Sequence, residues 1–142
     1  MLTAAFVASL AFGLLNFSGT VRARQAGFGR MLALHRSVRI QLDQSVPDSA
    51  AIVRAAAAEA QLARDLPSWF PPGTGPDRVS TYARAEVWTR NSDFRARANE
   101  LALALDDLGK AARSDNVGQM RAQQDRAAEA CQACHRSYLK LY

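Results

Sequence analysis

The feature that most constrains this chain is a five-residue motif near its C-terminus, Cys131-Gln132-Ala133-Cys134-His135. It holds both cysteines of the 142-residue chain and one of its two histidines. On a helix, residues three and four positions apart share a face, so both thiols and the imidazole would point the same way. Cys-x-x-Cys-His is the attachment signature of a c-type haem, in which the thiols bond to two vinyl groups and the imidazole binds the iron. We therefore predict one covalently bound haem c.

Other uses of a Cys-x-x-Cys pair fit this chain less well. A structural zinc site needs four ligands, but outside the motif the chain has one further histidine, His35, and no further cysteine. A thioredoxin-like redox pair lies where a strand meets a helix in a βαβ unit, whereas this motif lies deep in a helical pattern. A chance match to the motif is the remaining alternative.

Four segments of the chain carry mostly apolar residues at alternating spacings of three and four. This spacing is typical of the inward face of helices that cross at shallow angles. No segment alternates with period two, so strands are not expected. We predict an all-α fold, an antiparallel four-helix bundle with the haem near the C-terminal helix. The predicted inward positions are Arg24, Phe28, Met31, His35, Val38 and Leu42; Ile52, Ala55, Leu62, Leu66 and Trp69, interrupted by the polar Glu59; Phe94, Ala98, Leu101, Leu105, Leu108 and Ala112; and Val117, Met120, Gln124, Ala127, Cys131, Cys134, Tyr138 and Leu141.

Polar residues mark where three of these helices are expected to begin. Pro47 ends the first helix, and Asp48 or Ser49 can cap the second, because their side-chain oxygens accept from free backbone N–H groups. The corresponding residues are Asn91 or Ser92 for the third helix and Ser114 or Asp115 for the fourth.

Residues 70–76 contain three prolines and two glycines and cannot continue a helix. The connection runs on to about Asn91, and a loop this long in a small domain usually carries function or packs against something large. Trp69, Phe70 and Trp88 flank it. We expect them to cover apolar surface, either as plain core aromatics or at the edge of the haem.

The formal net charge of +5 does not indicate a nucleic-acid-binding protein. The basic residues are scattered over all helical segments instead of forming a block with interleaved aromatics. We interpret them as solvated helix faces, with an acidic redox partner as the alternative. The length favours one domain.

The N-terminal stretch has no charged side chain between Leu2 and Val21. Such a run is typical of an export signal or an uncleaved membrane anchor, and it also fits the first half of a long core helix. We expect residues 1–19 to be a signal peptide or apolar segment and residues 20–142 to form the bundle. Thioether attachment in bacteria takes place outside the cytoplasm, so we expect an exported, periplasmic protein. It would touch a membrane only through the N-terminal segment, if that is not cleaved.

Taken in order, these features resemble the cytochrome c′ family, the class II c-type cytochromes. The resemblance covers about residues 20–142, and its most specific element is Cys-x-x-Cys-His on the last of four helices, a few residues from the chain end. Class I cytochromes c carry this motif near the N-terminus. The supporting matches are the Arg24-x-x-x-Phe28-x-x-Met31 pattern, the loop of residues 70–74, Glu86-Val87-Trp88, Asp93-Phe94, and Tyr138 three residues after the haem histidine.

The resemblance implies a role for each of several residues. Cys131 and Cys134 would form the thioethers and His135 would be the proximal iron ligand. Phe28 falls at the position that faces the sixth coordination site of the iron, where low-spin relatives have a ligating methionine. A phenylalanine there has no lone pair to offer the iron. The implied haem is five-coordinate and high-spin. The remaining implied roles are a contact of Arg24 with a haem propionate and packing of Tyr138 against the haem.

The implied function is binding of nitric oxide or carbon monoxide, electron transfer, or both, without enzymatic turnover. An apolar distal pocket favours uncharged gases over anions, because it cannot stabilise a bound charge. The family also implies a homodimer through the first helices, while the redox partner stays unidentified. Leu139 stands where relatives often have Arg or Lys, and Lys140 or Arg136 would have to replace that charge.

Two alternatives stay open. Met31 could ligate the iron together with His135 if the first helix shifted by a turn, giving a six-coordinate, low-spin electron carrier. A haem enzyme such as a peroxidase or nitric oxide reductase would need a distal acid or base. His35 lies one turn beyond Met31, although a histidine with partners of its own within the bundle is the simpler interpretation.

Overall fold

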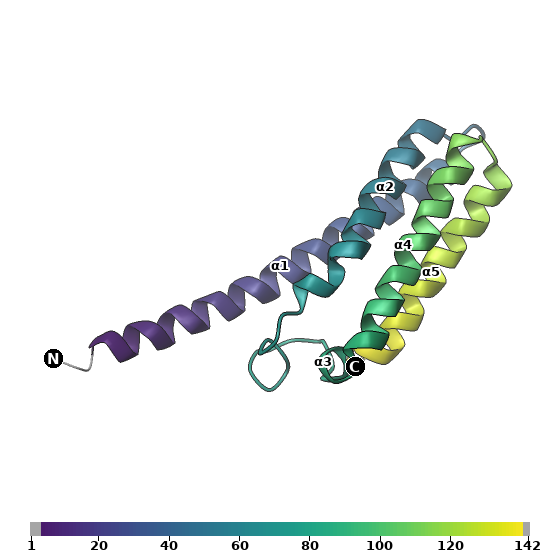
Figure 1. Ribbon diagram of the computed structural model, residues 1–142. Coiled ribbons are helices and arrows are strands. Elements are labelled where there is room, and N and C mark those ends of the chain that lie inside the picture. Colours follow the sequence, from purple (N-terminus) through teal and green to yellow (C-terminus); the bar gives the residue numbers. More distant parts are fainter. Residues whose placement is uncertain (1–3, 141–142) are drawn as a thin grey trace.

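The computed structural model describes residues 4–140, with side chains from residue 18 onward. Within this part, four long helices dominate and no strand occurs (Figure 1). This is the all-α arrangement that the spacing of apolar residues predicts. The helices are α1 (Ala4–Leu42), α2 (Ser49–Asp65), α4 (Asn91–Arg113) and α5 (Val117–Tyr138), with two single turns, η1 (Leu66–Trp69) and α3 (Glu86–Thr89), between α2 and α4.

Helix α1 is the longest element, and its N-terminal half extends away from the other helices (Figure 1). The predicted boundary at residue 19, between an N-terminal segment and the bundle, falls inside this helix and stays a prediction. Residues 1–3 of that predicted segment lie outside the described part of the chain. Over residues 4–140, no helix is both long and apolar enough to span a membrane.

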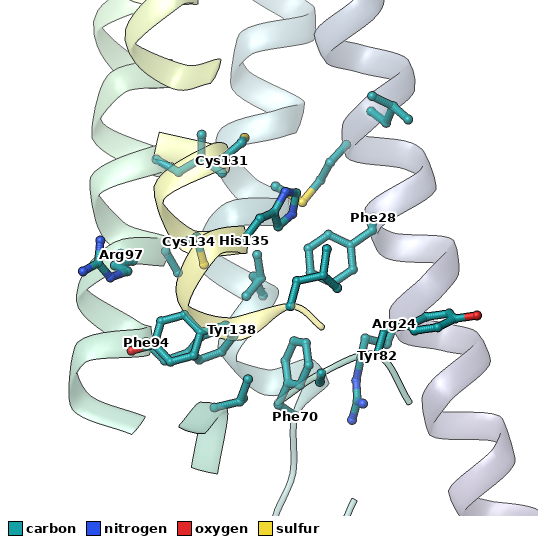
Figure 2. A pocket seen from close by; sticks show the side chains of 18 of the residues that line it. Arg24, Phe28, Phe70, Tyr82, Phe94, Arg97, Cys131, Cys134, His135 and Tyr138 are labelled. Atoms are coloured by element: carbon teal, nitrogen blue, oxygen red, sulfur yellow. The ribbon is translucent and has the colours of Figure 1, made fainter. Parts of the chain in front are cut away.

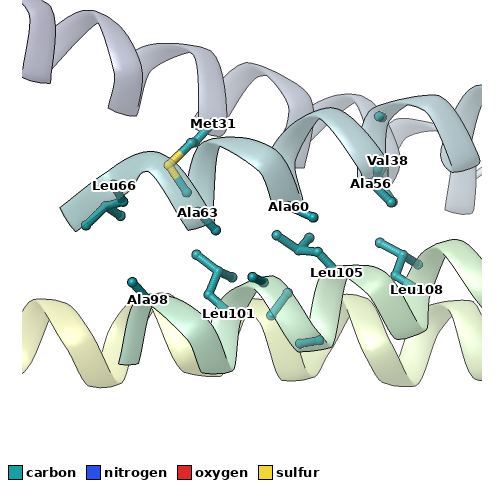
Figure 3. Close-up of a cluster of buried hydrophobic side chains, with 14 of the residues drawn as sticks. Met31, Val38, Ala56, Ala60, Ala63, Leu66, Ala98, Leu101, Leu105 and Leu108 are labelled. Carbon is teal, nitrogen blue, oxygen red and sulfur yellow. The ribbon is translucent and has the colours of Figure 1, made fainter. Parts of the chain in front are cut away.

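The core lies mainly between α2 and α4 and combines small residues with large ones (Figure 3). Ala56, Ala60 and Ala63 of α2 are fully buried, and their short side chains let the two helices approach closely. Leu105 and Leu108 of α4 are also fully buried and fill the space between the backbones. Matching large against small side chains in this way packs a core without voids.

Most of the predicted inward positions are buried. The exceptions are Phe28, His35, Leu62, Trp69 and Val117, together with the two cysteines, which are half-buried. Leu141 lies outside the described residues.

Helix α2 begins where the sequence predicts. The Asp48 side chain accepts a hydrogen bond from the backbone N–H of Ala51, with an N···O distance of 2.9 Å. This carboxylate satisfies one of the four backbone donors left free at a helix start. The helix ends at Asp65, and the chain continues through η1 to Trp69.

The third long helix begins at Asn91, where the sequence predicts its start, but the predicted cap is wrong because α3 continues almost directly into α4. Arg90 is the residue that flanks α4, so Asn91 and Ser92 lie inside the helix. The Asn91 side chain donates to the Val87 carbonyl oxygen instead, at 3.2 Å.

The predicted start of α5 is also wrong. Ser114 ends α4, and Asp115 adopts a left-handed backbone conformation with φ of 52°, which aspartate tolerates better than most residues. The cap is the next residue, Asn116, whose side chain accepts from the backbone N–H of Gln119 at 3.0 Å. Ser114 and Asp115, which the sequence pattern assigned to capping, instead form the tight turn between α4 and α5.

The loop that precedes α3 is tied to the end of α5. Ala83 and Leu139 form an isolated antiparallel bridge. The Arg84 N–H donates to the Tyr138 carbonyl at 2.9 Å, and the Lys140 N–H donates to the Tyr82 carbonyl at 2.8 Å. These bonds fix the last turn of the helix that carries the Cys-x-x-Cys-His motif.

The core between α2 and α4 predicts a graded effect of leucine truncation. Leu105→Ala should destabilise the protein by about 2–5 kcal/mol, because the alanines of α2 cannot move in to fill the cavity. The exposed Leu103 on the same helix is the matched control, and Leu103→Ala should change stability by no more than about 0.5 kcal/mol. Urea unfolding followed by circular dichroism measures both. Equal losses in the two variants would contradict this core.

Candidate functional site

A cavity of about 930 Å³ lies between α1, α4, α5 and the loop before α3. Figure 2 shows Cys131, Cys134 and His135 on one side of it, with Phe28 and Arg24 on α1 opposite. The volume is near the upper end of the range of about 300–1,000 Å³ seen for small-molecule and cofactor sites. The three motif residues therefore share one site that is large enough for an extended cofactor.

The two cysteines are not joined by a disulfide. Removal from water raises the pKa of each thiol to about 11, and the charge of Glu59 adds to the effect at Cys131. Reactive redox cysteines have a lowered pKa, because the thiolate is the attacking species. The raised pKa values disfavour a thioredoxin-like redox pair, and both thiols face one cavity in their protonated form.

His135 follows Cys134 on α5 and faces the same cavity. Partial burial lowers the pKa of its imidazole, because a charged ring is poorly solvated there. The neutral ring keeps a lone pair, which is the form that binds a metal. Among the described residues no group of three or more His, Cys, Asp or Glu is placed to hold a metal ion alone. Two thiols and one imidazole on a single face fit a haem and not a structural zinc site.

Phe28 begins a chain of aromatic contacts that crosses the site. Its ring meets that of Trp69 edge to face, with centroids 5.4 Å apart, and that of Phe70 at 6.3 Å. Phe70 in turn meets Phe94 at 5.1 Å, and Phe94 meets Tyr138 at 5.1 Å. Edge-to-face packing suits the charge distribution of aromatic rings. The result is an apolar wall from α1 to α5.

The loop aromatics divide into two roles. Phe70 lines the cavity, whereas Trp69 and Trp88 pack behind it. Trp69 lies so close to α1 that a side-chain carbon on Gly27 would come within 2.6 Å of its ring. The sequence allowed these aromatics to lie either at the edge of the haem site or in the plain core. Phe70 lies at the edge of the cavity, and the two tryptophans pack as core residues.

Arg24 is a buried cation, only 4% exposed, in the wall of the cavity. Its guanidinium donates to the Trp69 carbonyl at 3.1 Å and to the hydroxyls of Thr74 at 2.9 Å and Thr81 at 3.3 Å. It also stacks 4.1 Å over the Phe70 ring. Burial lowers its pKa. No ion pair to Arg24 occurs among the side chains that the structure describes, so this buried cation is able to meet an anionic group in the cavity.

Tyr138 is buried, and its ring lines the cavity. Its hydroxyl donates to the Asp93 carboxylate, which also binds Arg97 at 3.0 Å. These contacts, the tyrosine first, lower the pKa of Asp93, while burial and the same hydrogen bond raise the pKa of Tyr138. The last turn of α5 is thus anchored to the first turn of α4.

The two basic residues considered as replacements for the charge missing at Leu139 differ in position. Lys140 lines the cavity, while Arg136 is exposed and does not. Arg97 of α4 also lines the cavity. Sequence reasoning missed it because it lies one position off the apolar stripe of that helix.

A group of polar side chains at one end of the cavity was also missed. The Glu59 carboxylate is 1% exposed and lies 3.3 Å from His35 Nδ1, while Gln124 Nε2 lies 3.1 Å from His35 Nε2. His35 therefore has partners within the bundle, as the simpler interpretation expects. Met31, one turn away, is buried in the core and lines the same cavity. The signal in the sequence was the occurrence of polar residues at inward positions on three different helices.

The chain is similar to known proteins over most of its length. A family profile described as Cytochrome C′ matches residues 19–139. A cytochrome c′ from Pararhodospirillum photometricum is 32% identical over 117 residues, covering 82% of this chain and 90% of that protein. A second, from Rubrivivax gelatinosus, is 33% identical over 66 residues, covering 46% of this chain and 50% of that protein.

Solved structures show the same fold. The crystal structure of cytochrome c′ from Thermochromatium tepidum superposes with a TM-score of 0.77 at 23% identity, covering 88% of this chain and 97% of the other. A nitric oxide complex of a variant of cytochrome c prime from Alcaligenes xylosoxidans gives the same TM-score, identity and coverage. These likenesses confirm the predicted four-helix bundle.

The contact between Tyr138 and Asp93 predicts a change in acid stability. A carboxyl whose pKa is lowered by folding stabilises the fold above its usual range, and this contribution is lost as the pH falls through the lowered value. Tyr138→Phe removes the largest cause of the shift. The variant should therefore lose less stability than the wild type between about pH 5 and pH 2, as measured by urea midpoints.

Asp93→Asn supplies the control for this effect. In that background Tyr138→Phe should have the same effect at every pH in the window. A pH dependence of the Tyr138→Phe effect that survives in the Asp93→Asn background would assign it to another group.

Proposed function

The chain belongs to the cytochrome c′ family, and from this premise we propose that it is a periplasmic haem protein with five-coordinate, high-spin iron that binds small uncharged gases, transfers electrons, or both. Its cofactor is covalently bound haem c, as in the family. When bound, the haem supplies an iron that exchanges one electron and can take a diatomic gas at an open axial position. The observation that carries the proposal is the apolar wall around Phe28, opposite His135.

On the α5 side, three residues hold the cofactor. Cys131 and Cys134 lie one helical turn apart and both face the cavity, so each thiol can form one thioether. His135 offers the lone pair of a neutral imidazole to the iron, because partial burial lowers the pKa of the ring. The bonds from the loop to residues 138–140 hold this last turn of α5 in place.

On the α1 side, Phe28 lies across the cavity from His135, where it would face the iron, and it has no atom that can ligate a metal. Trp69 and Phe70 support its ring from behind, so it cannot easily turn away. The wall excludes water and offers no charge or hydrogen bond to a bound anion. A small uncharged gas such as nitric oxide or carbon monoxide loses little by entering it, and this is the basis for the proposed ligand preference.

Arg24 and Tyr138 position the cofactor at its edge. Arg24 is held rigidly by three acceptors and an aromatic ring and has no carboxylate partner among the described side chains. A haem propionate would supply the missing negative charge. Tyr138 presents its ring to the cavity, while its hydroxyl is bound to Asp93 outside it.

Several further parts of the proposal draw on relatives. The nitric oxide complex of an Alcaligenes xylosoxidans relative supports gas binding, and another structural relative has a dimer whose dissociation is controlled by ligand. We therefore propose a homodimer, to which the exposed Leu32 and Ile40 of α1 would contribute. Family members are exported c-type cytochromes, and the apolar stretch before Arg22 supports a periplasmic location.

A six-coordinate electron carrier is the second candidate, because Met31 also lines the cavity. Its side chain is 6% exposed and packs with the buried core, so ligation would require it to leave that packing. Enzymatic turnover has less support, since His35 is already engaged by Glu59 and Gln124.

Phe28 provides the test of the proposal. The haem-loaded wild type should show high-spin optical spectra in both oxidation states and bind carbon monoxide when reduced. Phe28→Ala removes the ring that covers the open axial position and should speed carbon monoxide association by about tenfold or more, a barrier change of roughly 1.4 kcal/mol. Stopped-flow mixing measures the rate.

Two variants complete the test. Leu103→Ala, a change at an exposed position of α4 that does not line the cavity, should leave the association rate unchanged. Met31→Leu should leave the spectrum unchanged as well. A methionine-to-iron charge-transfer band in the ferric wild type that disappears in Met31→Leu would instead establish the six-coordinate alternative.

A further inference from the structure

We propose that Glu59 and His35 form a proton-binding site that takes up one proton when the haem is reduced. This inference rests on the haem function proposed above, and it concerns residues to which that function assigns no role. It would couple electron transfer by this protein to the proton concentration around it.

The site lies where three polar side chains meet inside an otherwise apolar bundle. His35 comes from α1, Glu59 from α2 and Gln124 from α5. Glu59 is 1% exposed and Gln124 is 4% exposed. Polar groups are expensive to bury unless they are hydrogen-bonded, and ionised ones more so. Three such residues at matched inward positions indicate a role beyond packing.

The hydrogen bonds around Gln124 determine the state of the histidine. Gln124 Nε2 donates one hydrogen to the His35 carbonyl at 3.1 Å, and its other hydrogen is directed to His35 Nε2, also at 3.1 Å. The ring nitrogen that accepts this bond carries no proton, so the network assigns the ring hydrogen to Nδ1. Nδ1 lies 3.3 Å from the Glu59 carboxylate. The hydrogen bonds therefore place a neutral imidazole beside the buried carboxyl group of Glu59.

This arrangement leaves hydrogen-bonding capacity unused. His35 Nδ1, Glu59 Oε2 and Gln124 Oε1 are buried and form no hydrogen bond with the described residues. Two of these atoms are acceptors that lack a donor. One added proton on the carboxylate removes its buried charge and supplies such a donor.

The pair is close enough to the haem site to respond to its charge. His35 and Glu59 both line the haem cavity. Glu59 is also among the causes, after burial, of the raised pKa of Cys131, a thioether cysteine. Charges interact strongly in such poorly solvated surroundings, so one unit of charge at the iron should change the proton affinity of the pair on the order of tenfold.

A separate polar pocket offers protons a route from solvent. It has a volume of about 230 Å³, and His35 and Gln124 form its inner side. The exposed residues Arg39, Asp43, Arg121 and Asp125 are the charged groups that line it. His35 therefore lies between this pocket and the haem cavity.

The other titratable groups that face the pair come from two helices. Cys131 of α5 lies beside Glu59, and as a thioether it has no proton to exchange. Arg97 of α4 lines the haem cavity and keeps its proton. The charged groups of the side pocket are in contact with water, which screens them. Glu59 with His35 is thus the pair most directly exposed to a change of charge at the haem.

The coupled step is balanced in charge. When an external one-electron donor reduces the iron, the site loses one unit of positive charge that had stabilised the Glu59 carboxylate. One proton from bulk water then passes through the side pocket and forms an O–H bond on the carboxylate. Oxidation by an external one-electron acceptor reverses both transfers, and the proton returns to water.

The test is the pH dependence of the reduction potential of the haem-loaded protein. The potential of the wild type should fall with rising pH wherever the pair exchanges its proton, because protons favour the reduced state. Glu59→Gln keeps the shape of the side chain and cannot bind the proton, so the slope should disappear. Glu129→Gln, the same change at an exposed position of α5, should retain the slope of the wild type.

Infrared difference spectra identify the group directly. Reduction of the wild type should produce the C=O band of a protonated carboxylic acid, which Glu59→Gln should lack. If Glu59→Gln does not fold, His35→Gln serves instead, because removing the imidazole beside the carboxylate should move the pH range of the slope. An unmoved range would overturn the pairing.

Two results would overturn the inference without touching the haem function. One is a potential that does not change with pH in a protein with an intact haem spectrum. The other is a slope that persists in Glu59→Gln, which would assign the proton to another group such as a haem propionate. Failure to incorporate haem at all would count against the proposed function itself.

Discussion

The structure depends on one constraint, the position of Cys131, Cys134 and His135 on the inward face of α5. A helix whose inward face must hold a large flat cofactor cannot pack tightly against the helix opposite. The bundle accommodates this by separating α1 from α5 over the cavity of about 930 Å³ and by placing its tightest packing between α2 and α4. There the alanines of one helix meet the leucines of the other. The helices α1 and α5 thus enclose the cavity for the cofactor, while α2 and α4 form the tightly packed core. Side chains in one region can therefore change without disturbing the packing of the other.

The chemical character of the cavity lining changes from one end of the cavity to the other, along the direction of α1. At one end Arg24 supplies a fixed positive charge, held by carbonyl and hydroxyl oxygens of the loop. In the middle Phe28, Phe70 and Phe94 line the cavity with phenyl rings that offer neither donors nor acceptors. At the other end the buried carboxyl group of Glu59 lies beside the imidazole of His35. A haem bound here would have an anchor for its propionates, an apolar site for ligand at the iron, and a polar group near its thioether edge.

The sequence predicted the bundle because its apolar spacing is regular, and it predicted the centre of the site because the motif is local. Cys131, Cys134 and His135 lie within five residues on one helix, so helical geometry alone places them together. Asn91 or Ser92 and Ser114 or Asp115 were wrong as helix caps, because the path of the connecting turns decides which residue caps a helix, and that path depends on tertiary structure. Thr74 and Thr81 belong to a loop with no periodic pattern, so nothing in the sequence placed them beside Arg24. Glu59 and Gln124 were visible as polar interruptions, but their meeting with His35 depends on how three helices are aligned.

Covalent attachment of haem to α5 is the central claim, and mass spectrometry of the denatured holoprotein tests it most directly. The protein would be expressed in the periplasm together with a haem-maturation system, then unfolded and extracted with acidic organic solvent. The account predicts a polypeptide heavier by one haem that keeps its pigment through extraction, with the added mass located on a peptide that contains Cys131 and Cys134. A polypeptide of unmodified mass, or pigment that passes into the solvent, would contradict it.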